Sequence, residues 1–166
     1  SPPHGGTGSA APSEPTMLAA ETHAFLTDLA DRPPVDEALW LEALTHGSTG
    51  AARDYQRLEF LGDRVLGLVI AEWLYAAETG DEGRLSQRLN ALVSRATCAR
   101  IARAIGLGAH IRLGKQARDD GGADSDNILG DVVEAVIGAS FVTHGFDATR
   151  TMVRRLWADA VGGQTG

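Results

Sequence analysis

Four acidic side chains stand in two pairs within the two most apolar segments of the sequence. Glu59 and Asp63 are four residues apart, and Asp131 and Glu134 are three residues apart. On a helix, either spacing places both side chains on one face, where like charges repel each other. One such pair is usually a solvated surface, but two pairs in two apolar helices indicate carboxylates that share a ligand.

Two such helices that cross would bring the four carboxylates together. An oxygen-only cluster suits Mg²⁺, with Mn²⁺ as a substitute, better than Zn²⁺, and the sequence offers no Cys/His ligand set. Mg²⁺ held by few carboxylates keeps water ligands, activates one of them as a nucleophile and neutralises phosphoryl oxygens. We therefore expect a magnesium site that hydrolyses phosphodiesters, with no small-molecule cofactor.

The segments that carry these acids belong to a chain in which helix follows helix. Apolar residues recur at spacings of three and four, and no stretch alternates long enough to predict a strand. The sequence therefore predicts an all-α fold. The expected helices are Leu18–Ala30, Asp36–Thr45, Tyr55–Glu78, Leu85–Ile105, Asn127–Thr143 and Asp147–Val161, with a polar connection over Arg112–Asp126.

Glycines interrupt the same two apolar helices, where each costs about 1 kcal/mol relative to alanine. They are Gly62 and Gly67 in the first helix, and Gly130 and Gly138 in the second. They serve either a close approach of two helix backbones or an ordinary thinning of the helix for packing.

Length and composition limit the possible classes of protein. The 166 residues have a net charge of −7, a hydrophobic fraction of 43% and one cysteine, Cys98, which excludes a disulfide scaffold and global disorder. The acidic balance opposes binding of nucleic acid by bulk charge. Ala135–Phe146, the longest apolar stretch without a charged residue, is far shorter than the roughly 20 residues of a membrane helix. We expect a cytoplasmic protein with no membrane partner.

The ends of the chain differ in composition from the middle. Residues 1–16 hold four of the six prolines and no large apolar residue, so they are expected to be a disordered tail. Residues 17–161 are expected to form one domain, and residues 162–166 read as the start of a flexible linker.

Two strings around the acidic pairs resemble motifs of one family, the ribonuclease III family. Arg57–Leu66 (RLEFLGDRVL) is similar to its signature segment, and Ile128–Gly138 (ILGDVVEAVIG) is similar to its second motif. Three further stretches occur in the order that the family has, namely Leu44–Ser48, Glu82–Ser86, and Leu113–Lys115 with Gly121–Gly122. The resemblance covers roughly residues 20–160, the whole endonuclease domain.

The resemblance implies a helical homodimer that cleaves double-stranded RNA with Mg²⁺ and leaves 5′-phosphates and short 3′ overhangs. Carried over by position, Glu59, Asp131 and Glu134 match the metal-binding carboxylates of the family. Asp63 and Glu134 match the catalytic acids, Asp63 completing the cluster and helping to position the attacking water. Phe60 matches a residue of the dimer contact. The apolar surface of the helix over 55–78 also favours a dimer.

The sequence departs from the bacterial pattern in three places. Gln56 replaces an acid that many bacterial members carry three residues before the first catalytic Glu. The segment from Asp119 to Asp126 is acidic where basic residues are usual, which leaves Lys115 and Arg118 as the charges there for a phosphate backbone. We also expect the C-terminal double-stranded RNA-binding domain of bacterial members to be missing, because only residues 162–166 follow the last helix.

Two other functions remain open at this point. An all-α nucleotide pyrophosphohydrolase also holds Mg²⁺ with helix-borne acids but lacks the signature string. A non-cleaving RNA-binding protein on the same fold would be expected to lose one of the four acids. Five arginines could contact phosphates, although such residues are more typical of solvated helix faces; they are Arg84, Arg88, Arg95, Arg100 and Arg103. The first three of them are expected to lie near one face of a single helix. His46 and Cys98 are expected to be structural.

Overall fold

The chain forms helices throughout residues 16–163, which are the residues described in the computed structural model. Within this range the one extended pairing is an isolated bridge between Thr45 and Arg112. The prediction of an all-α fold is confirmed. The α-helices are α1 (Ala20–Ala30), α2 (Glu37–Ala43), α3 (Gln56–Ala77), α4 (Glu82–Leu92), α5 (Arg95–Ile105), α6 (Lys115–Asp119), α7 (Asp126–His144) and α8 (Phe146–Gly163), with short 3₁₀ turns at Gly47–Thr49, Leu107–His110 and Gly122–Asp124.

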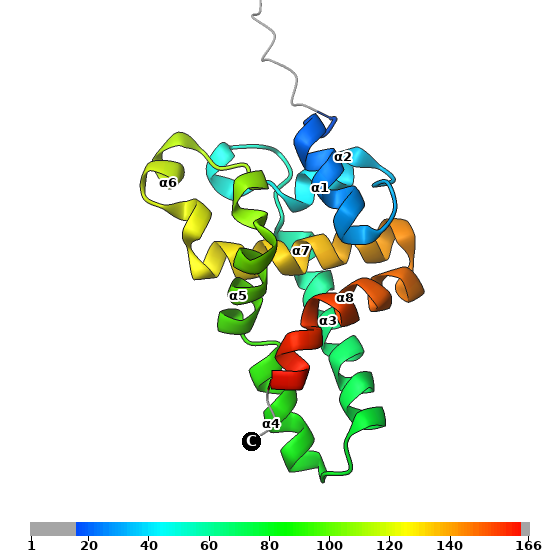
Figure 1. The fold of residues 1–166 in the computed structure, drawn as a ribbon. Coiled ribbons are helices and arrows are strands. Elements are labelled where there is room, and N and C mark those ends of the chain that lie inside the picture. Colours follow the sequence, from blue (N-terminus) through cyan, green and yellow to red (C-terminus); the bar gives the residue numbers. More distant parts are fainter. Residues whose placement is uncertain (1–15, 164–166) are drawn as a thin grey trace, which may run out of the picture.

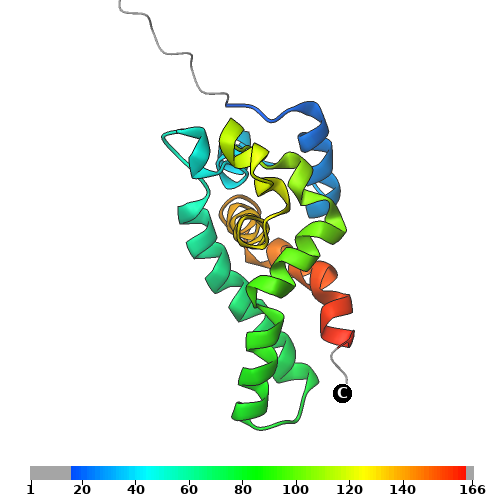
Figure 2. The same cartoon turned by 90° about the vertical axis from the view of Figure 1, so that its left-hand side faces the viewer.

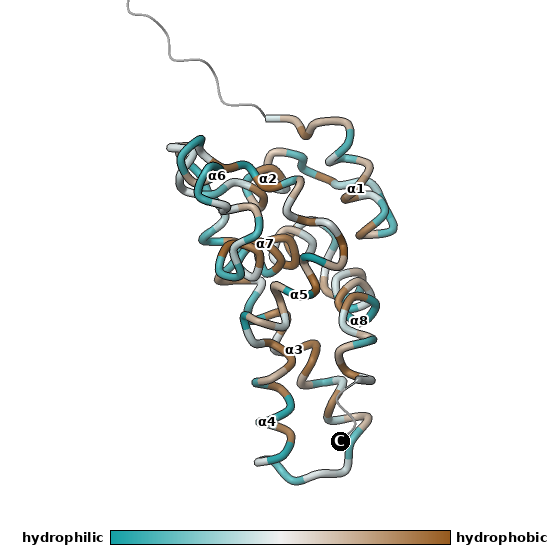
Figure 3. The backbone as a smooth tube through the Cα atoms, turned by 60° about the vertical axis from the view of Figure 1, so that its left-hand side comes forward, coloured by the Kyte–Doolittle hydropathy of each residue, from teal (hydrophilic) through white to brown (hydrophobic). Residues whose placement is uncertain are grey.

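Helix α7 lies at the centre of the molecule, with α3, α5, α8 and α2 packed around it (Figures 1 and 2). Nearly every residue from Leu129 to Ser140 is buried, and the tube of α7 is the most continuously hydrophobic in Figure 3. A helix that is apolar on all sides must be covered on all sides. The α7 sequence therefore dictates the arrangement of its neighbours, which include the fully buried Trp40 and Trp157.

Helix α3 crosses α7 with the two backbones in direct contact. A Cβ atom built on Gly62 would lie 1.7 Å from the carbonyl oxygen of Glu134, and one built on Gly138 would lie 2.3 Å from the carbonyl oxygen of Leu58. Of the two roles left open for the glycines, close approach of the helix backbones is therefore the one that Gly62 and Gly138 serve. Gly67 faces open space, so it plays no such part.

The prediction of a single helix over Leu85–Ile105 is wrong, because the helix is interrupted between Leu92 and Arg95. The Ser94 side chain accepts a hydrogen bond from the backbone N–H of Thr97 and so caps a new helix. As a result, Arg95 lies on α5, whereas Arg84 and Arg88 lie on α4, and the expected common face of the three arginines does not exist.

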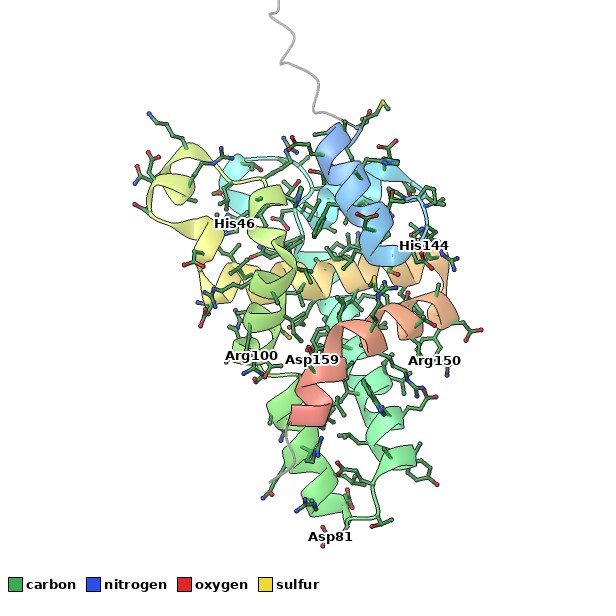
Figure 4. The ribbon with its side chains drawn as sticks, in the orientation of Figure 1. His46, Asp81, Arg100, His144, Arg150 and Asp159 are labelled. Carbon is green, nitrogen blue, oxygen red and sulfur yellow. The ribbon has the colours of Figure 1, made fainter. Side chains whose placement is uncertain are left out.

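Helices α3 and α4 form a hairpin that projects away from the rest of the domain (Figure 2), with Asp81 at its tip (Figure 4). The Asp81 side chain caps α4 by accepting a hydrogen bond from the N–H of Arg84 at 3.0 Å. Arg88 of α4 forms an ion pair of 2.6 Å with Glu78, the residue that follows α3, and donates to the Val161 carbonyl. This side chain therefore ties the hairpin to the end of α8.

The structure also differs from expectation in the polar connection and at the end of the last helix. The polar connection expected over 112–126 contains α6 and a 3₁₀ turn. Helix α8 includes Gly162 and Gly163, two residues past its expected end. The expected tail and the rest of the expected linker, residues 1–15 and 164–166, lie outside the described residues. In the part of the chain that the structure covers, no helix is both long enough and apolar enough to cross a membrane.

Candidate active site

The four acids predicted from the sequence meet in one place. Glu59 and Asp63 from α3, and Asp131 and Glu134 from α7, line the same open depression of about 490 Å³. Its other lining residues are Tyr55, Gln56, Phe60, Arg64 and Arg95. The depression lies beside the α3–α7 crossing, so the contact at Gly62 sets the separation of the two acid-bearing helices.

Asp131 is held from two sides. The Tyr55 hydroxyl donates a hydrogen bond to Asp131 Oδ2 at 3.0 Å, and Arg95 Nη1 lies 3.1 Å from Oδ1. The Oδ1 atom is buried and accepts no hydrogen bond, so the Arg95 contact is an ion pair without hydrogen-bond alignment. A buried carboxylate oxygen without a hydrogen bond is an unmet demand for a donor or a cation.

Asp63 and Glu134 differ in their exposure to solvent. The Asp63 side chain is 43% exposed and pairs with the neighbouring Arg64. Glu134 is buried, with 9% of the residue exposed. Solvent therefore reaches the site from the side of Asp63, while Glu134 forms part of its floor.

Burial, together with the crowding of like charges, raises the pKa of two of the acids. Burial, together with the neighbouring Asp63, raises the pKa of Glu134 from 4.5 to about 8. Burial and a hydrogen bond with Asp131 raise the pKa of Glu59 to about 7. Burial and the Asp131 carboxylate also raise the pKa of Tyr55, which keeps its hydroxyl a donor. Without a further cation, the site cannot ionise fully near neutral pH.

The donor chemistry of the depression fits a hard divalent cation. All four candidate ligands are carboxylates, which Mg²⁺ prefers, and Asp131 Oδ1 has no hydrogen bond to lose. As the side chains stand, no three His, Cys, Asp or Glu residues among those described form a ready metal centre. The acids instead raise one another's pKa across the helices, Glu59 beside Asp131 and Glu134 beside Asp63. Binding of a cation would offset this repulsion between like charges.

The other residues singled out in the sequence take varied positions. Phe60 is at the edge of the depression and is 64% exposed. His46 is occupied by its local turn, where Nδ1 lies 2.7 Å from Ser48 Oγ. Cys98 is buried, as expected. Arg103 is bound to Asp124 and Asp126, so part of the acidic segment before α7 is neutralised within the protein.

Two residues of the site were not assigned there from the sequence. Tyr55 stands four residues before Glu59, a spacing that places both on one helix face and is the signal that was available. Arg95 was grouped with surface arginines, because its approach to Asp131 depends on the break before α5.

Comparison with known proteins gives a consistent result. The family described as Ribonuclease-III-like matches residues 36–160. Ribonuclease 3 of Zymomonas mobilis is 61% identical over 132 residues, which cover 79% of this chain and 53% of the relative. Ribonuclease 3 of Rhodobacter capsulatus is 49% identical over 144 residues, which cover 85% and 63%. The chain thus spans between half and two thirds of the length of these relatives.

Solved structures agree with the sequence comparison. The nuclease domain of ribonuclease III from Campylobacter jejuni superposes with a TM-score of 0.77 and 34% identity, covering 86% of this chain and 97% of that one. A second structure of that domain, described for flexibility in a region involved in dimer formation, gives a TM-score of 0.76, 37% identity and coverages of 80% and 93%. The match spans most of the chain. This chain belongs to the ribonuclease-III-like family.

Proposed function

We propose that this domain is a divalent-metal-dependent endonuclease that cleaves double-stranded RNA in RNA processing. The observation that carries the proposal is the convergence of Glu59, Asp63, Asp131 and Glu134 in one depression. In this proposal Glu59, Asp131 and Glu134 hold Mg²⁺, or Mn²⁺ in its place. The bound ion supplies Lewis acidity and charge neutralisation for phosphodiester hydrolysis.

Residues of the chain itself perform the other tasks. Tyr55 fixes the orientation of Asp131 through its hydrogen bond at 3.0 Å. Asp63, the more exposed acid, is placed to accept a hydrogen bond from the attacking water and to take up its proton. Glu134, at the floor of the depression, holds negative charge where a cation is needed and positions that same water from the other side. In this proposal water attacks phosphorus and the P–O3′ bond breaks, so that one product carries a 5′-phosphate and the other a 3′-hydroxyl; two offset cuts leave 3′ overhangs.

The proposal includes a homodimer. Phe60 and Leu68 on α3 and Val142 on α7 are large apolar side chains that are more than half exposed. Phe60 and Val142 also line a depression with Leu39, Leu58 and Leu61, together with the polar residues Glu42, Arg53, Gln56 and Arg57. Burial of exposed apolar side chains is a common basis for self-association. A twofold pairing would give one acid cluster for each RNA strand. We assign the dimer to the cytoplasm, where RNA duplexes are processed.

The deciding experiment is incubation of the purified domain with a long RNA duplex, with and without Mg²⁺, at low ionic strength. We expect cleavage in Mg²⁺ or Mn²⁺ alone, 5′-phosphate ends and staggered 3′ overhangs. Single-stranded RNA of the same sequence is the matched control and should remain largely intact. Products with 5′-hydroxyl ends, or cleavage that persists in excess chelator, would contradict the proposal, and binding without cleavage would favour a non-cleaving RNA-binding protein.

The dimer is tested separately by sedimentation at micromolar concentration. The parent domain should sediment as a dimer, and Phe60→Ser should shift the population toward monomer because it removes an exposed aromatic ring from the surface. His46→Ala, a change at another place on the surface, is the control and should leave the dimer intact. A parent domain that remains monomeric would refute the homodimer.

A further inference from the structure

A cation from the protein itself already lies among the four acids. Arg95 lines the depression with Glu59, Asp63, Asp131 and Glu134, and its Nη1 is 3.1 Å from Asp131 Oδ1. The other lining cation, Arg64, is paired with the exposed Asp63. Arg95 is therefore the positive group closest to the buried end of the cluster.

The path of the Arg95 side chain is built into two helices. Arg95 is the first residue of α5, which Ser94 caps. Its stem passes over Gly130, where an added Cβ would lie 3.3 Å from Arg95 Cγ. Its Nη1 also donates to the Asn127 carbonyl at 3.3 Å. The missing side chain at position 130 gives the guanidinium access to Asp131.

The contact joins a half-exposed guanidinium to a largely buried carboxylate. The Arg95 side chain is 48% exposed, and the Asp131 side chain is 15% exposed. Helix α5 is anchored independently by buried side chains, among them Cys98 and Ile101. The contact neutralises a carboxylate whose other neighbours in the depression are the Tyr55 hydroxyl and three acids.

A divalent ion and the guanidinium compete for the same carboxylate. Both are positive, and a metal ion at Asp131 would stand within a few ångströms of Arg95, where they repel each other. Resting on the proposed metal site, we propose that Arg95 is a resident counter-cation that occupies Asp131 in the metal-free protein and is displaced when a divalent ion binds. Arg95 then sets how much Mg²⁺ the site requires.

The test measures metal binding without RNA, so it does not depend on cleavage. Mn²⁺ is titrated into the dialysed domain by calorimetry at about 0.05 M salt, where screening is weak. Arg95→Gln should bind Mn²⁺ at least about threefold more tightly than the parent, because the competing charge is gone. The control is Arg100→Gln, which removes the same charge from the same helix but lies beside a different depression, between α5 and α8. Its affinity should change by less than about twofold.

Three outcomes would overturn the inference. Unchanged or weaker Mn²⁺ binding by Arg95→Gln would show that Arg95 does not compete. Equal tightening by Arg100→Gln would show an effect of net charge alone. A parent domain that binds no Mn²⁺ would refute the proposed metal site and this inference together. Failure of this inference alone is distinguishable, because the parent would then bind Mn²⁺ and Arg95→Gln would bind it no more tightly. Circular dichroism melting of each variant verifies that the fold is retained.

Discussion

The two halves of helix α3 treat their acids in opposite ways. Toward the C-terminal end, Glu72 pairs with Arg150 at 3.2 Å and Arg154 at 3.4 Å, and Glu78 pairs with Arg88 at 2.6 Å. Figure 4 places Arg150 on α8, the helix that also carries Arg154. Toward the N-terminal end, Glu59 and Asp63 face two further acids, Asp131 and Glu134, which lie on α7.

This difference separates acids that stabilise the fold from acids that cost stability. The C-terminal pairs tie α3 to α4 and α8, as expected of groups that serve the fold. At the N-terminal half, the raised pKa values of Glu59, about 7, and of Glu134 on the facing α7, about 8, reflect buried negative charge that the protein neutralises only in part. An unfavourable cluster that persists in a well-packed helix pair is typical of a functional site.

The largest expected effect comes from exchanging one acid in each region. Glu134→Gln keeps the size of the side chain but removes a charge that the divalent ion requires, so the cleavage rate should fall at least about a thousandfold. Glu72→Gln, in the C-terminal region, should stay within about threefold of the parent. Initial rates on a duplex substrate with Mg²⁺ measure both. A Glu134→Gln rate within tenfold of the parent would remove Glu134 from the proposed site.

The second effect concerns the backbone that holds the acidic half together. Gly62→Ala would place a Cβ 1.7 Å from the Glu134 carbonyl oxygen, so the helices must separate, and we expect a loss of about 3 kcal/mol or more in the free energy of unfolding. Gly67→Ala meets no atom within 4 Å and should stabilise the helix by up to about 1 kcal/mol. Urea denaturation measures both. Equal effects of the two changes would contradict the close crossing.

The third effect concerns stability, where breaking an ion pair in the C-terminal half of α3 should cost more than breaking one in the N-terminal half. Arg88→Met would leave Glu78 without its cation in a site where both side chains are at most 20% exposed, so the free energy of unfolding should fall by about 1–3 kcal/mol. Arg64→Met, which breaks the exposed pair with Asp63, should cost less than about 0.5 kcal/mol. Thermal melting distinguishes the two. A greater loss for Arg64→Met would mean that the acidic half contributes the stability.

The smallest effect is a pH dependence of stability in the chelated protein. Because the pKa of Glu134 is raised from 4.5 to about 8, the folded state holds a proton that the unfolded state releases, and stability must fall as pH rises through this window. Allowing for solvent screening, we expect a loss on the order of 1 kcal/mol between pH 5 and pH 8. Glu134→Gln should show a flatter profile in urea denaturation. If the free energy of unfolding of the parent rose from pH 5 to pH 8 while that of Glu134→Gln did not, the result would contradict the raised pKa of Glu134.

Most of the fold could be predicted from the sequence, because long stretches with apolar residues at helical spacing indicate where the long helices lie. Helices α3 and α7 begin and end within a residue of their expected bounds. The break before α5 was missed because apolar residues continue across it at helical spacing, although Ser94 was an available start signal. Helix α6 is too short to show a period.

The same reasoning explains what the sequence showed of the site. The four acids were predictable, because each pair is local and contrasts with an apolar surrounding. The roles of Tyr55 and Arg95 were not, since each reaches Asp131 only through the packing of separate helices. The apolar period of α3 also implied a largely buried helix, yet Leu68 is 58% exposed, on a face that one copy of the domain leaves uncovered.

The contact of Gly62 and Gly138 with the facing backbone has a consequence for how this protein can change over evolutionary time. Where main chain rests on main chain, the distance between two helices does not depend on the size of any core side chain. Substitutions elsewhere in the core can therefore accumulate, and even exchange volume between layers, while the acid-bearing strips of α3 and α7 keep their spacing. The price is that neither glycine can be replaced alone, so these two positions should tolerate the least variation among sequences that share the fold.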